Sequence, residues 1–266
     1  MLNRKIDNDI DAHFSNSKKA LFLTGARQVG KTYSIRKYAK RHGLNLIEFN
    51  FLLQPETMDI INGAGDVKEL LLRISAYSRI PLVRSRTLIF FDEVQECPDV
   101  MTWVKALVDE GSYIYALSGS LLGVELKDIR SVPVGYMSEM QVYPMDFEEF
   151  VSAVGVPENV LEAVKKSWSE KTPVDAYIHE KMMQLFQLYI IVGGMPAAVQ
   201  TYMDSNNIQN VVKEQRDIIN LYKKDIARYD QDARKKLYID EVFDLIPSEL
   251  NAKNKRFILK RLNENM

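Results

Sequence analysis

Cysteine is almost absent from this chain. Cys97 is the only cysteine in 266 residues, which excludes an intramolecular disulfide. The three histidines lie far apart, without the Cys and His spacing of a zinc site. No run approaches the ~18 apolar residues of a membrane span, and the first residues lack the continuous apolar core of a secretory signal. We therefore expect a reducing, cytoplasmic location and no membrane partner.

An excess of charge of one sign is also missing. The chain carries 35 basic and 36 acidic residues, a net charge of -1, so it has no bulk positive field that would attract nucleic acid. Two local basic clusters, at 36–42 and 253–261, leave DNA open as a partner, although solvated helix faces are the commoner explanation of such clusters. The composition, 46% hydrophobic, is that of an ordinary globular protein.

Short apolar runs alternate with helical patterns between residues 20 and 120, which is typical of a parallel sheet covered by helices. The runs LIFF and YIYAL are apolar on consecutive residues, as in strands buried on both faces. Residues 132–144 predict a further strand. After Pro144 the patterns are helical in period, and we expect the aromatic residues there to form the core between helices and sheet: Tyr177, Phe186, Tyr189, Tyr202, Tyr222 and Tyr229.

The segment GARQVGKT, residues 25–32, matches the pattern G-x-x-x-x-G-K-[ST] and lies between a predicted strand and a predicted helix. The glycines let the backbone wrap closely, so that amide groups and the helix N-terminus face phosphates. In this pattern Lys31 reaches the β- and γ-phosphates, and the Thr32 hydroxyl binds Mg²⁺. We predict a nucleotide site formed by Gly25, Ala26, Arg27, Gln28, Val29, Gly30, Lys31, Thr32 and Tyr33.

A second acidic element follows downstream in the run LIFFDE. Asp92, at the predicted end of this strand, is expected to hold Mg²⁺ through water. Glu93 is the candidate base that orients the attacking water. Apolar strands often end in acidic turn residues, so this pattern is weak alone, but together with the loop it favours a nucleotide hydrolase.

The next predicted strand ends in LSGS, residues 117–120. If this strand lies between the strand before the phosphate loop and LIFFDE, Ser118 or Ser120 points at the γ-phosphate as a sensor. A structural turn closed by the serine hydroxyls is an equally good explanation.

The segments that carry these features occur in an order and spacing that resemble a family of bacterial and archaeal AAA-like P-loop ATPases: LFLTGARQVGKT, TLIFFDEVQ, ALSGS, VYPMDFEEF, VGGMPAAVQTY and LYKKDIARY. The resemblance covers most of residues 1–230. It implies an α/β fold of the P-loop NTPase type, in which a three-layer αβα domain with a mainly parallel sheet is followed by a helical domain. It also implies ATP as the nucleotide, but little about the biological task.

On this basis we predict a P-loop ATPase domain at 1–150, a helical lid at 151–232 and the start of a C-terminal region at 233–266. Members of the family continue well beyond the point where this sequence ends, so a piece of a longer protein and a shortened member are both open readings.

Two further features depend on the resemblance. The run GGMP, 193–196, is similar to a Gly-x-Pro element that related ATPases place near adenine, so Gly194 and Pro196 are candidate base contacts. The simpler alternative is that Gly193 ends one helix and Pro196 begins the next. Relatives carry an arginine after the glycine of the PVG run, where this chain has Tyr136. Arg130 is the nearest remaining candidate for an arginine finger, against a solvated loop charge.

Together these features predict Mg²⁺-dependent ATP hydrolysis that drives a conformational switch between the sheet domain and the lid. Two alternatives stay open, a nucleotide-gated scaffold that binds ATP without turnover and a small-molecule P-loop kinase. The adjacent Asp92 and Glu93 favour water over a kinase acceptor. Sites of this kind often need a neighbouring subunit, so a protein partner or self-association is a further expectation.

Overall fold

The computed structural model describes residues 2–120, 135–229 and 233–251. The chain divides into two compact units, Met1–Asn206 and Asn207–Met266. The predicted division at 150 and 232 stays a prediction. Within the described ranges no single helix is long and apolar enough to cross a membrane.

The first unit is built on a sheet of five parallel strands in the order β2-β3-β4-β1-β5. The strands are β1 (Ala20–Gly25), β2 (Asn45–Asn50), β3 (Thr87–Asp92), β4 (Ile114–Ser120) and β5 (Met137–Gln141). The predicted parallel sheet is confirmed. The strand that ends in LSGS, β4, lies between β1 and β3, so the condition set for a serine sensor is met.

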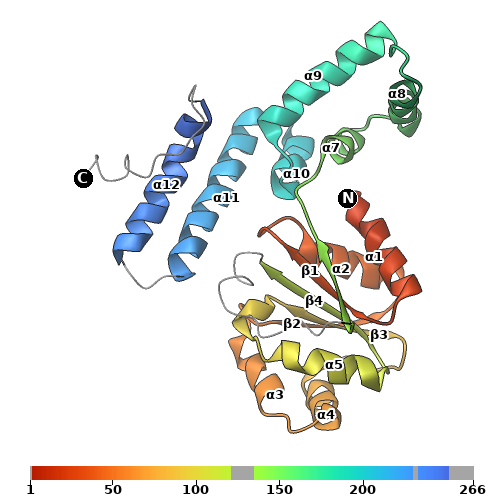
Figure 1. Cartoon of the computed structure of the whole chain (residues 1–266), viewed down its shortest axis with the longest axis vertical. Helices are drawn as coiled ribbons and strands as arrows, with labels where there is room; N and C mark the ends of the chain where they lie inside the picture. The colour runs from red at the N-terminus through yellow and green to blue at the C-terminus, as the bar shows by residue number, and fades with distance from the viewer. Residues whose placement is uncertain (1, 121–134, 230–232, 252–266) are drawn as a thin grey trace. The chain divides into compact units, whose positions relative to one another are not determined.

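Helices cover both faces of this sheet (Figure 1). One face packs on α1 (Lys5–Asn16) and α2 (Lys31–Arg41). The other packs on α3 (Met58–Asn62), α4 (Val67–Tyr77) and α5 (Val100–Glu110), with two short 3-10 turns, η1 (Pro55–Thr57) and η2 (Val94–Glu96). These layers confirm the predicted αβα arrangement.

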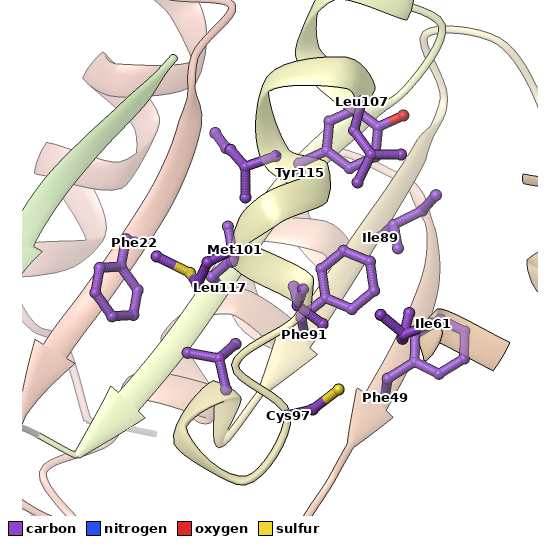
Figure 2. Close-up of a cluster of buried hydrophobic side chains, with 14 of the residues drawn as sticks. Phe22, Phe49, Ile61, Ile89, Phe91, Cys97, Met101, Leu107, Tyr115 and Leu117 are labelled. Atoms are coloured by element: carbon purple, nitrogen blue, oxygen red, sulfur yellow. The ribbon is translucent and has the colours of Figure 1, made fainter. Parts of the chain in front are cut away.

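Side chains of the central strands alternate between two apolar cores, because successive residues of a strand point to opposite faces. Phe22 and Phe91 lie in the core beneath α5, whereas Leu21 and Phe90 lie in the core beneath α1 and α2. Figure 2 shows the first of these cores, where strand residues meet Met101 of α5. Each fully buried side chain of this size contributes about 1.5–3 kcal/mol, so the cores hold the strand ends, and the site built on them, in place.

Helix α1 was not predicted from the sequence. It buries Ile6 and Ile10 against the sheet and packs Phe14 beside them. The spacing of these three residues, four apart, is the signal of an amphipathic helix. The short N-terminal segment before α1 also contributes to the site, as described below.

Four helices follow the sheet in this unit: α7 (Phe147–Ala153), α8 (Glu158–Glu170), α9 (Ala176–Val192) and α10 (Pro196–Ser205). Asp146 caps α7 through a reciprocal pair of hydrogen bonds with Glu149. Gly193 ends α9 with a positive φ of 74°, and Pro196 is the first residue of α10. The simpler explanation of the GGMP run, a helix end followed by a helix start, is therefore confirmed.

The aromatic core expected here is only partly present. Tyr189 packs on Phe147 and Phe150 and donates a 2.9 Å hydrogen bond to the Met145 carbonyl. The prediction is wrong for Tyr177, which lies on the surface, whereas Phe186 is partly exposed but packs its ring on Phe147 and Tyr189. Tyr202 and Tyr222 are half-buried, and the side chain of Tyr229 lies outside the described residues.

The second unit contains α11 (Ile208–Tyr229) and α12 (Ala233–Asn251). The two helices pack on each other, and Lys223 of α11 forms a 2.5 Å ion pair with Asp244 of α12.

Candidate functional site

The loop between β1 and α2 depends on two glycines with positive φ, 140° at Gly25 and 100° at Gly30. A Cβ atom at Gly25 would lie 2.2 Å from the Val142 carbonyl oxygen, so only glycine fits there. Gly30 takes its left-handed conformation directly before α2. Between them, Ala26 and Gln28 are exposed and Val29 is buried. The loop thus leaves the N-terminus of α2, the positive end of its dipole, open to an anion.

Lys31 is buried although it is charged, with 5% of its surface exposed. Its ammonium donates to the carbonyl oxygens of Gly25 at 3.0 Å and of Ala26 at 2.8 Å. Burial lowers the pKa of Lys31, and the carboxylates of Glu93 and Asp92 oppose this shift. The half-buried Arg27 lies close enough for its charge to lower the same pKa. A phosphate group would be a stronger acceptor for this ammonium than the neutral carbonyls.

Asp92 is the centre of a hydrogen-bond network at the end of β3. Thr32 Oγ1 and Asn50 Nδ2 each donate to Asp92 Oδ2 at 2.9 Å, and the Ser118 hydroxyl donates to Oδ1. Burial raises the pKa of Asp92, whereas the hydrogen bond from Ser118 lowers it. The network brings together the ends of β2, β3 and β4 and the start of α2. The Mg²⁺ roles of Thr32 and Asp92 and the sensor role of Ser118 stay predictions.

The donor set fits Mg²⁺. Mg²⁺ prefers oxygen ligands and is commonly held by one or two protein groups together with substrate phosphates. The Thr32 hydroxyl and the Asp92 carboxylate are two such oxygen groups beside the phosphate loop. They would hold the ion directly or through water.

Glu93 takes a left-handed conformation, with φ of 59° and ψ of 49°, which is uncommon for a residue other than glycine. Its carboxylate accepts a hydrogen bond from the side-chain amide of Gln95. Gln95 is fully buried, and its own amide oxygen accepts a 3.4 Å hydrogen bond from the backbone N–H of Ser120. Gln95 therefore connects the candidate base to the end of β4.

A cavity of about 310 Å³ adjoins the phosphate loop. Gln28 and Gly30 of the loop line one part of it, and Tyr33 of α2 lines another. Pro196 and Gln200 of α10 also line it, and the remaining lining residues are Leu2, Arg4 and Ser34. The cavity therefore lies between the loop and the first residues of α10, which Pro196 begins.

Gly194, one of the two predicted base contacts, is not among the residues that line this cavity. Gly194 packs on residue 145 instead, where its carbonyl accepts a 2.7 Å hydrogen bond from the Met145 N–H. A Cβ atom at Gly194 would lie 2.2 Å from the Met145 carbonyl oxygen, which explains why a glycine is needed there. Arg130 lies outside the described residues.

Residues 17–151 match the family model described as an AAA domain. The chain belongs to the AAA domain family. The match spans the sheet with its phosphate loop, the acidic residues of β3 and the serines of β4. A second model, described only as a domain of unknown function, matches residues 183–266. No curated protein matches the chain.

Solved structures similar to this AAA protein include the Walker-type ATPase of Pyrococcus abyssi, at 16% identity, with 100% of this chain and 89% of that chain covered and a TM-score of 0.49. The Aeropyrum pernix ORC1 protein in complex with DNA is 13% identical, with 99% and 82% covered and a TM-score of 0.40. Cdc6p from Pyrobaculum aerophilum is 13% identical, with 82% and 60% covered and a TM-score of 0.39.

Several residues of the AAA site were missed from the sequence. Asn50 follows an apolar strand as Asp92 does, so its place at the same sheet edge could have been inferred once the strand order was known. Gln95 lies two residues after Glu93, but nothing in the sequence indicates that it is buried. Arg4 and Gln200 are remote from the motifs, and only the fold brings them to the phosphate loop and the cavity.

Proposed function

We propose that this AAA protein binds ATP with Mg²⁺ at the loop between β1 and α2 and hydrolyses it. The observation that carries the proposal is the convergence of loop and strand-end groups at one edge of the sheet. Thr32 and Asp92 lie in direct hydrogen bond, and the charges of Asp92 and Glu93 both act on the ammonium of Lys31. Family membership supports nucleotide binding, and this convergence supports hydrolysis.

Binding follows from charge and geometry. The loop amides and the N-terminus of α2 face the phosphates, and Lys31 exchanges its carbonyl partners for phosphate oxygens. Thr32 and Asp92 hold Mg²⁺, which supplies positive charge to the phosphate oxygens when bound. The base occupies the cavity between Tyr33 and Gln200.

Hydrolysis requires a water molecule oriented toward the γ-phosphate. Glu93 accepts a hydrogen bond from this water and takes its proton as the oxygen of the water bonds to the γ-phosphorus and the bond to the bridging oxygen breaks, releasing ADP and phosphate. Such a role contributes typically about 10²–10⁴-fold to the rate. We assign the role of γ-phosphate sensor to Ser118, which donates to Asp92, or to Ser120, at the end of β4; the contact of Ser118 with Asp92 supports this assignment.

The same site would act as a switch. The phosphates of bound ATP contact the phosphate loop, and its base contacts α10. Loss of the γ-phosphate therefore changes how tightly ATP holds the sheet and the following helices together. We further propose that self-association contributes to turnover, because AAA-type sites are often completed by a neighbouring subunit.

Equilibrium binding of ATP and Mg²⁺, followed by phosphate release, tests the proposal. The wild-type protein is expected to bind and to release phosphate, with a rate per molecule that rises with protein concentration. Lys31→Ala is expected to bind at least about 100-fold more weakly, because two charge-assisted contacts are lost. Lys40→Ala, which removes an exposed lysine from the same helix, is the matched control. Tight binding without phosphate release at any concentration would favour the nucleotide-gated scaffold.

A further inference from the structure

Arg4 lies directly before α1 and is buried, with 6% of its side chain exposed. Its guanidinium donates three hydrogen bonds to three different segments. Nε donates to Glu149 Oε1 at 3.0 Å, Nη1 to the Val29 carbonyl at 2.9 Å and Nη2 to the Tyr143 carbonyl at 2.7 Å. One side chain therefore connects the N-terminal segment, the phosphate loop, the connection after β5 and helix α7.

The bond to Val29 fixes one peptide of the phosphate loop. A trans peptide is rigid and planar, and its C=O and N–H groups point in opposite directions. Because the Val29 carbonyl points at Arg4, the N–H of Gly30 in the same peptide points away from Arg4. In a loop that binds phosphate through its amides, this orientation decides whether the amide is available to the anion.

Glu149 holds Arg4 in place. Its Oε1 accepts from Arg4 and from the Lys5 N–H at 2.7 Å, and its Oε2 accepts from the Asp146 N–H at 3.0 Å. Both partners of the ion pair are buried, with 6% and 7% of their side chains exposed. Loss of one partner would leave an unpaired buried charge, so the pair holds the start of α7 and the phosphate loop together as one structure.

We propose that Arg4 is a positioning residue of the nucleotide site. It holds the Val29–Gly30 peptide in the orientation that presents the Gly30 amide to phosphate, and through Glu149 it couples this orientation to the helices after the sheet. The inference rests on the proposed nucleotide binding. It assigns to Arg4 the orientation of this peptide and no contact with the nucleotide phosphates: each of the three guanidinium nitrogens donates to a protein acceptor, and the side chain also lines the cavity assigned to the base.

Lys37 offers a matched control. Its ammonium donates to the Leu2 carbonyl at 3.1 Å and to Asp7 Oδ2 at 2.6 Å, and 11% of its side chain is exposed. It is therefore a second largely buried cation that ties the same N-terminal segment to the sheet domain, without contact to the phosphate loop.

The test is calorimetric titration of the full chain with ADP and with a slowly hydrolysed ATP analogue, for wild type, Arg4→Met and Lys37→Met, with thermal unfolding of each. Both variants are expected to unfold at lower temperature. Only Arg4→Met is expected to bind nucleotide more weakly, by about tenfold or more. This is the usual effect of losing a charge-assisted hydrogen bond, here the bond from the Gly30 amide to phosphate.

Affinity within twofold of wild type in folded Arg4→Met would overturn the inference. So would an equal loss in Lys37→Met, which would mean that the effect is only structural. If Arg4→Met does not fold, Arg4→Lys gives the same test, since it keeps a cation beside Glu149 but has one donor nitrogen for three acceptors. Failure of the wild type to bind either nucleotide would instead refute the proposed function, and with it this inference.

Discussion

The hydroxyl of Thr32, at the start of α2, donates a 2.9 Å hydrogen bond to the carboxylate of Asp92, at the end of β3. The two residues are 60 positions apart in the sequence. They meet because β1 and β3 are parallel and flank β4, so both strands end at the same edge of the sheet. This contact joins the phosphate loop to the acidic strand, and the predictions below concern the groups around it.

Asp92→Asn is expected to stabilise the nucleotide-free protein while it abolishes Mg²⁺-dependent binding. Burial raises the pKa of Asp92 above its ordinary value of 3.8, so the folded state binds this proton more tightly than the unfolded state. Ionisation of Asp92 therefore lowers the free energy of unfolding of the wild type. This loss begins near the ordinary pKa and grows as the pH rises through the raised pKa. Asparagine has no such charge. Its amide oxygen can accept from Thr32 and Asn50, and its amide nitrogen can donate to the hydroxyl oxygen of Ser118.

Thermal unfolding from pH 4 to pH 8 measures this effect, at about 2–4 °C per kcal/mol for a protein of this size. The gain in Asp92→Asn should be largest at pH 8 and shrink as the pH falls toward the ordinary pKa of 3.8. Asp109→Asn, at an exposed position of α5, is the control. A lower unfolding temperature for Asp92→Asn at pH 8 would contradict the account.

Gln95→Glu is expected to move the acidic limb of the kcat–pH profile to higher pH. The new carboxylate would lie beside Glu93, and a neighbouring like charge raises the pKa of a carboxyl group. Gln95→Met removes the same hydrogen bonds without adding charge, so it should lower kcat by about tenfold or more and move the limb less than Gln95→Glu does. Nucleotide affinity should change little in either variant. Identical pH profiles for the two variants would rule out the contact between Gln95 and Glu93 during turnover.

Gly194→Ala is expected to destabilise the protein by about 1–3 kcal/mol, the usual effect of overpacking. The added methyl group would overlap the Met145 carbonyl oxygen and displace the start of α10, so affinity for ADP should fall as well. Gly65→Ala is the control, since its nearest neighbour is the mobile end of the Glu69 side chain at 3.2 Å. Denaturant unfolding measures both, and a change below about 0.5 kcal/mol in Gly194→Ala would show that the backbone there yields easily.

Tyr33→Ala is expected to weaken ATP binding by about tenfold and to leave tripolyphosphate binding unchanged, because Tyr33 lines the cavity assigned to the base and not the phosphate loop. Competition against a fluorescent nucleotide, with Gln184→Ala on the exposed face of α9 as the control, makes the comparison. An equal loss of affinity for ATP and for tripolyphosphate would mean that the base does not bind beside Tyr33.

The sheet and its phosphate loop could be predicted because their signals are local. The backbone geometry of one loop requires the residue types at Gly25, Gly30 and Lys31. Burial on two faces requires apolar residues along the strands. The position of β4 between β1 and β3 was not predicted; it was only stated as the condition for a serine sensor. This position brings Ser118 to Asp92, to which it donates a hydrogen bond.

The remaining parts of the site depend on contacts between distant segments. Arg4 precedes a helix that the sequence analysis missed, and its three acceptors lie 25 to 145 residues away. Gly194 was expected near the base, but its role is a close backbone approach to Met145, which no local pattern reveals. The lid boundaries, the roles of Glu93 and Ser120, and the choice between turnover and a gated scaffold stay predictions.

The most direct test of the central claim is phosphate release from ATP and Mg²⁺ by the wild type and by Glu93→Gln, each paired with a binding titration. It is run across protein concentration, with and without DNA. The account predicts that Glu93→Gln binds ATP as tightly as wild type and releases phosphate about 10²–10⁴-fold more slowly. Equal rates in the two proteins, or an equal loss of ATP binding in Glu93→Gln and Lys31→Ala, would contradict the role of Glu93 as the catalytic base.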